Sequence, residues 1–91
     1  MMGFNTDVIY NGVVYHVQTE PRKDGGIETI VYTQGAVIRK FKSAWQDLLN
    51  SPDDNKDMLK RLLEDQHRQV IARIRAGQIV PQASPSVSSQ S

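Results

Sequence analysis

Apolar and polar positions alternate through the first half of the chain. Residues 8–20 read VIYNGVVYHVQTE, two alternating segments on either side of Asn11-Gly12. Both central residues of a type I′ turn have positive φ, which Asn and Gly tolerate well. The pattern predicts a β-hairpin in which Ile9 lies opposite Val14 and Asp7 lies opposite His16. The side chains on its predicted core face are Val8, Tyr10, Val13, Tyr15 and Val17.

A second alternating pair of segments, IETIVYT and AVIRKFK, flanks Gln34-Gly35 and predicts a second hairpin. Pairing outward from the turn gives two faces that both carry apolar residues. One face is expected to hold Val31, Thr33, Ala36 and Ile38. The other is expected to hold Ile30, Tyr32, Val37, Arg39 and Phe41. This hairpin is therefore predicted to be covered on both sides, or to belong to a strongly curled sheet.

The pattern then changes to helical spacing. Ser43 is expected to cap a short helix in SAWQDLLN, residues 43–50. A long helix over residues 53–76 follows, with Ser51 as N-cap and Pro52 at its first position. Gly77 marks its end. The apolar positions of this long helix are Met58, Leu59, Leu62, Leu63, Val70, Ile71 and Ile74.

The order of elements predicts an α+β fold. It consists of a four-stranded antiparallel meander of two hairpins, then the short helix, then the long C-terminal helix packed on the sheet. Residues 1–80 are expected to form this single domain. Residues 81–91, PQASPSVSSQS, carry no charge and are predicted to be a disordered tail.

Composition narrows the classes of function. The 91 residues carry a formal net charge of +1 and include no cysteine, which removes thiol catalysis and cysteine-ligated metal sites. No cofactor is expected. No apolar run approaches the roughly 20 residues of a membrane span, and MMGFNTDV lacks the layout of a secretion signal. The expectation is a soluble cytoplasmic protein that does not bind membranes.

Three motifs carry a resemblance to known sequences. FNTDVIY, VYHVQTE and EDQH, the last within the closing helix, together resemble a group of short uncharacterised bacterial proteins. The resemblance covers about residues 4–78. It implies a bacterial protein that stands alone, and it implies no mechanism and no functional residues.

Candidate catalytic chemistry is confined to two histidines. A carboxylate such as Asp7 can orient the imidazole of His16 for proton transfer, but ordinary polar pairs across strands are far commoner. His67 lies near the apolar stripe of the long helix, where a partly buried histidine is commoner than a metal ligand. An enzyme or metal site around Asp7 and His16 is thus the third interpretation.

The second interpretation is a sheet-based nucleic-acid binder. Arg39, Lys40 and Lys42 surround Phe41 in one predicted strand, as in some β-sheet readers of nucleic acid. Arg39 and Lys40 point to opposite faces, however, so they do not form one flat basic patch.

The favoured interpretation is a small, non-enzymatic protein–protein interaction module that pairs with itself. A helix of about 24 residues is roughly 36 Å long, whereas strands of about seven residues span about 23 Å. The end of the helix is therefore expected to protrude as an apolar patch, which typically marks a contact surface. The expected partner-binding residues of this homodimer are His67, Val70, Ile71 and Ile74.

Overall fold

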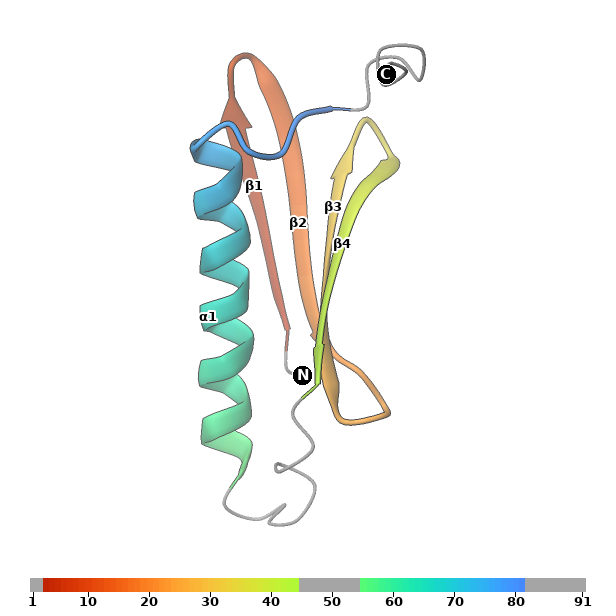
Figure 1. Cartoon of the computed structure of the whole chain (residues 1–91), viewed down its shortest axis with the longest axis vertical. Helices are drawn as coiled ribbons and strands as arrows, with labels where there is room; N and C mark the ends of the chain where they lie inside the picture. The colour runs from red at the N-terminus through yellow and green to blue at the C-terminus, as the bar shows by residue number, and fades with distance from the viewer. Residues whose placement is uncertain (1–2, 45–54, 82–91) are drawn as a thin grey trace.

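The computed structural model describes residues 3–44 and 55–81 (Figure 1). Four antiparallel strands form one sheet in the order β1-β2-β3-β4, and one long helix lies on one side of it (Figure 1). The predicted α+β meander is confirmed. The elements are β1 Phe4–Tyr10, β2 Val13–Pro21, β3 Gly26–Thr33, β4 Ala36–Ala44 and α1 Asn55–Arg75.

The first hairpin has the predicted register. Tyr10 pairs with Val13, and Asp7 pairs with His16. Asn11 and Gly12 have φ values of 55° and 79°, the positive angles of a type I′ turn. Gln34 and Gly35 repeat this geometry in the second hairpin, with φ values of 52° and 81°.

The predicted faces of the second hairpin are wrong for Arg39 and Phe41, which lie on the core side. Tyr32 pairs with Val37, but Val31 pairs with Arg39, so Ile38 is an extra residue in a β-bulge. The bulge moves Arg39 and Phe41 to the side of the sheet that faces α1. Val37 remains on the opposite side, where it is 49% exposed. The expectation that apolar cover lies on both sides is therefore not met at Val37.

The core lies between α1 and the strands β1, β2 and β3 (Figure 1). Burying apolar side chains here supplies the main stabilisation of so small a domain. The fully buried members of the core cluster are Val8, Tyr15, Val17, Val31, Val70, Ile74 and Ile79. By contrast Met58, near the start of α1, is 52% exposed.

The prediction that the end of α1 protrudes beyond the sheet is wrong. Val70 is 2% exposed and Ile74 is 0% exposed, while Ile71 is half-buried against the core. The reason is one of length. The helix has 21 residues and strand β2 has 9, which makes both roughly 30 Å long.

Ser43 does not cap a helix, because it lies within β4 near the end of that strand. The rest of the expected short helix, residues 45–50, lies outside the described residues. So do Ser51 and Pro52, the expected start of the long helix, and most of the expected tail. Among the described residues no helix is both long and apolar enough to cross a membrane.

The predicted stop at Gly77 is confirmed. Its φ is 74°, and its N–H donates to the carbonyl of Ile74 while the N–H of Gln78 donates to that of Arg73. These two bonds define a Schellman motif. The reversal places Ile79 in the core, where it is 1% exposed.

Replacing Gly77 with alanine should lower the free energy of unfolding by about 1–2 kcal/mol, because a side chain disfavours the left-handed conformation. A Cβ there would also lie 3.0 Å from the hydroxyl oxygen of Tyr10. Urea unfolding measures the loss. The matched control is Ala76→Gly at the exposed neighbouring position. A Gly77→Ala protein as stable as the parent would contradict the proposed role of the motif.

Candidate functional site

The two faces of the sheet differ in what covers them. The helix α1 packs on one face, and no described helix packs on the other (Figure 1). We call this second side the outer face. The outward side chains on it, taken from the register, are Asn5, Asp7, Ile9, Val14, His16, Gln18, Glu20, Glu28, Ile30, Tyr32, Val37, Lys40 and Lys42.

Asp7 and His16 form the predicted pair on the outer face. The Nδ1 of His16 lies 2.6 Å from the Oδ1 of Asp7, and the two side chains are 49% and 66% exposed. The hydrogen bond orients the imidazole and leaves Nε2 available. A catalytic base gains most from a site that excludes water, and this pair is open to solvent. The geometry suits a hydrogen-bonding contact with a partner better than proton transfer.

A shallow hollow of about 440 Å³ adjoins this pair. Tyr32 lies opposite His16 in the register, and its hydroxyl donates to Oε1 of Gln18 over 3.3 Å. Asp7, His16, Gln18 and Tyr32 all line the hollow. Three adjacent strands thus present ordered polar groups at one place.

We call Asp7, His16, Gln18 and Tyr32 the polar row. Large aliphatic side chains lie beside it. Ile9 is 72% exposed, Val14 is 41% exposed and Val37 is 49% exposed. Ile9 and Val14 are direct partners across β1 and β2, and Val37 is the partner of Tyr32. We call Ile9, Val14 and Val37 the outer apolar patch.

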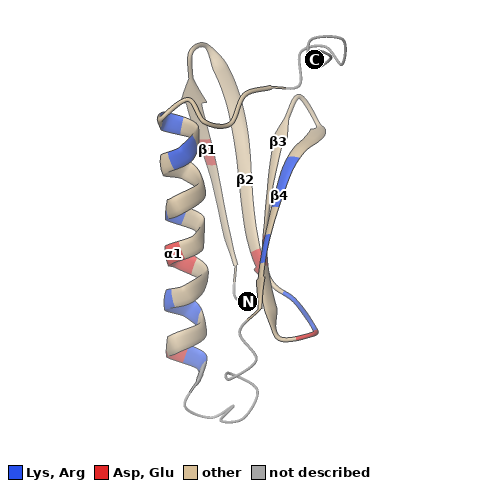
Figure 2. Ribbon diagram, viewed as in Figure 1, with Lys and Arg blue, Asp and Glu red and all other residues tan. Residues whose placement is uncertain are grey.

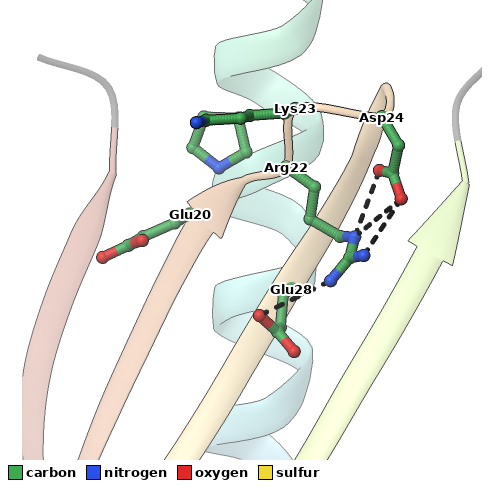
Figure 3. Close-up of a pocket in the computed structure, with 6 residues that line it drawn as sticks. Glu20, Arg22, Lys23, Asp24 and Glu28 are labelled. Carbon is green, nitrogen blue, oxygen red and sulfur yellow. Dashed lines mark hydrogen bonds and ion pairs between the residues drawn. The ribbon is translucent and has the colours of Figure 1, made fainter.

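A second hollow, of about 390 Å³, lies at the β2–β3 turn (Figure 3). There the guanidinium of Arg22 bonds both oxygens of Asp24 and lies 3.7 Å from Glu28. The hydrogen bond from Arg22 lowers the pKa of Asp24, and the same bond raises the pKa of Arg22. Figure 3 shows Glu20 and Lys23 directed away from this group. Arg22, Asp24 and Glu28 thus form a network of ion pairs at the β2–β3 turn.

His67, predicted from the sequence to be a partner-binding residue, is instead buried, with 5% exposure. Its Nε2 lies 2.8 Å from the hydroxyl of Thr6 and its Nδ1 lies 2.8 Å from the hydroxyl of Thr19. The ring of Phe4 packs against it with centroids 5.6 Å apart. Within residues 3–44 and 55–81, no group of three or more His, Asp or Glu side chains is arranged to hold a metal ion.

The hydrogen bonds of His67 continue across the whole sheet. Thr19 and Thr29 hydroxyls lie 2.7 Å apart, and Gln66 donates its amide N–H to Thr29 over 3.0 Å. Ser43 donates its hydroxyl to the amide oxygen of Gln66. One hydroxyl from each strand therefore joins two neighbouring side chains of α1. We call Thr6, Thr19, Thr29, Ser43, Gln66 and His67 the hydroxyl network.

This network was not predicted from the sequence. Its signal was present, because Thr19 and Thr29 stand at inward positions of alternating strands. Inward threonines have no obvious partner until the helix is placed over the sheet, so spacing within each strand did not reveal the network.

The basic residues of β4 lie on both sides of the sheet, as predicted. Arg39 stacks on Phe41 toward α1, with its Cζ 4.7 Å from the ring centroid, while Lys40 and Lys42 pair with Ile30 and Glu28 toward the outer face. The three proposed nucleic-acid contacts therefore do not share one surface.

The fold and the site define a small α+β domain in which the described residues cover one face of the sheet with α1. No protein family, curated protein or solved structure matches this chain.

Proposed function

We propose that this chain is a small, non-enzymatic interaction module that pairs with a second copy of itself through the outer face of its sheet. One observation carries the proposal, the outer apolar patch. Isolated exposed aliphatic residues are ordinary, but these three lie on one face, where the ordered side chains of His16 and Tyr32 stand between Val14 and Val37. Exposed apolar surface rimmed by polar side chains is typical of protein contact sites.

The size of the outer face sets the expected strength of pairing. Strands lie about 4.8 Å apart and rise about 3.3 Å per residue, so this face covers roughly 500 Å² and two copies bury about 1,000 Å². That area is at the lower end of specific interfaces. We therefore expect a weak, reversible dimer.

The polar row supplies the rest of a contact surface. Sheets pack face to face about 10 Å apart, with side chains of both faces interdigitating. The imidazole Nε2 of His16 and the hydroxyl of Tyr32 then lie within the contact, next to the outer apolar patch. A two-fold arrangement presents the same groups from both copies.

Sedimentation equilibrium tests the proposal over a range of micromolar concentrations. The average mass of the parent chain should rise with concentration toward twice 10.3 kDa. The double variant Ile9→Glu with Val37→Glu should remain monomeric, because a two-fold contact would bury four added carboxylates. Both positions are largely exposed, so the variant should keep its fold.

The matched control replaces two exposed apolar residues outside the outer face, Met58→Glu with Val80→Glu. These side chains are 52% and 64% exposed, and the control should dimerise like the parent chain. A parent mass that stays monomeric at all concentrations would sink the proposal. Equal loss of pairing in both double variants would also contradict it.

A further inference from the structure

The strand β4 has a free side. It is the last strand in the sheet order, and among the described residues no strand pairs with its second edge. Alternate backbone N–H and C=O groups of such an edge point outward and form a template for another extended segment. All of Ala36–Ala44 is at least partly exposed.

Cationic side chains flank this free edge on both sides. On the α1 side, the guanidiniums of Arg39 and Arg73 both lie over the ring of Phe41, at 4.7 Å and 5.4 Å from its centroid. On the outer side stand Lys40 and Lys42. Figure 2 shows these basic positions along β4 and near the end of α1. We call Arg39, Lys40, Lys42 and Arg73 the cationic edge.

These charges lack acidic partners in the part of the chain that the structure describes. The ion pairs there involve Arg22, Arg68 and His16, and none includes a member of the cationic edge. Lys42 stands opposite Glu28 in the register, but Glu28 lies 3.7 Å from Arg22 instead. An anion near Phe41 would be attracted by the guanidiniums of both Arg39 and Arg73.

We propose that the free edge of β4 binds an extended acidic peptide segment of a partner protein, which adds to the sheet as a fifth strand. Main-chain hydrogen bonds to β4 hold such a segment, and its side chains select it. Because side chains of a strand alternate between faces, acidic residues at neighbouring positions meet Arg39 and Arg73 on one side and Lys40 and Lys42 on the other. This site uses the backbone edge of β4, whereas the outer-face pairing proposed above uses the outer apolar patch; Lys40 and Lys42 border both surfaces.

The same geometry disfavours two other occupants. A second copy that paired through β4 would bring two cationic edges together, and like charges opposite each other in a sheet are destabilising. A nucleic acid lying along one face would meet only half of the charges. An extended segment with acidic side chains on both of its faces meets the arginines on one side of the sheet and the lysines on the other.

Titration of a fluorescent peptide tests this binding by fluorescence anisotropy. The probe has nine residues, the length of β4, and is built of glutamate and valine with glutamates at both odd and even positions. The parent chain should bind it, and the double variant Arg39→Glu with Lys40→Glu should bind at least tenfold more weakly. A lysine–valine probe should bind this double variant more tightly than it binds the parent chain. The matched charge control is Lys60→Glu with Arg61→Glu on the exposed surface of α1, which should bind the acidic probe like the parent.

Two N-methylated probes test strand addition itself. Methylating the alternate amides that face β4 should weaken binding at least tenfold, whereas methylating the other set should change it little. Equal binding of both methylated probes, or equal loss in the two double variants, would show simple charge attraction and overturn the proposal. Tighter binding of a single-stranded oligonucleotide of the same charge would overturn it in favour of nucleic acid. The single variant Ile9→Glu, on β1 and away from β4, should bind the acidic probe normally, so failure of outer-face pairing is distinguishable from failure here.

Discussion

Replacing His67 with alanine should lower the free energy of unfolding by about 3 kcal/mol, and the melting temperature by roughly 15 °C for a domain of this size. The substitution opens a cavity beneath α1 and leaves the hydroxyls of Thr6 and Thr19 without their partner. A buried polar group that loses its partner costs about 1–3 kcal/mol, and the cavity adds to that cost. Thermal melting followed by circular dichroism measures the change.

The chain contains its own matched control for this experiment, because it has two histidines. His16 is on the outer face with a side chain 49% exposed, so His16→Ala should change stability by less than about 0.5 kcal/mol. Similar losses in the two variants would contradict the assignment of His67 to a stabilising role. Thr19→Val keeps the shape of the side chain and removes the central hydroxyl. It should also destabilise the fold, since both His67 and Thr29 lose their hydrogen bond to Thr19.

The hydroxyl network has one direction of donation that satisfies its members when His67 is neutral. Gln66 donates to Thr29, Thr29 to Thr19, and Thr19 to Nδ1 of His67. The Nε2–H of His67 then donates to Thr6. Protonating His67 turns Nδ1 into a donor, so Thr19 must reverse and Thr29 loses its acceptor. The network therefore favours the neutral imidazole.

Stability should therefore fall in mild acid. Burial lowers the pKa of His67 below its ordinary value of 6.5, which is the value expected in the unfolded chain. Below about pH 6.5 the unfolded state binds a proton that the folded state does not, so acid favours unfolding. The stabilising contribution is complete above pH 6.5 and decreases by up to about 1.4 kcal/mol per pH unit as the pH falls toward the folded-state pKa.

Urea unfolding between pH 5 and pH 7.5 measures this dependence. His67→Gln should remove the component assigned to His67, whereas His16→Asn should retain it. The difference between parent and variant isolates His67 from the carboxylates, which titrate at lower pH. An equal dependence on pH in the parent and in His67→Gln would show that this histidine is not responsible.

The sequence by itself determined the local elements and the first register. Asn11-Gly12 and Gln34-Gly35 specify two turns with positive φ, and strict alternation around the first of them places Asp7 beside His16. Gly77 ends the helix because it tolerates the left-handed conformation. These are features of a few neighbouring residues, so their physical chemistry is present in the sequence.

Tertiary structure decided which apolar side chains are buried and which remain exposed. The bulge at Ile38 places Arg39 and Phe41 on the side of the sheet that faces α1, and no single residue in AVIRKFK indicates the bulge. The match in length between α1 and the strands buries Val70 and Ile74, which the expected mismatch between a longer helix and shorter strands predicted to protrude. The hydroxyl network needs one side chain from every strand and two from α1, so it exists only when segments distant in sequence meet. Burial and such networks depend on what packs against a side chain, and one segment read alone does not contain that information.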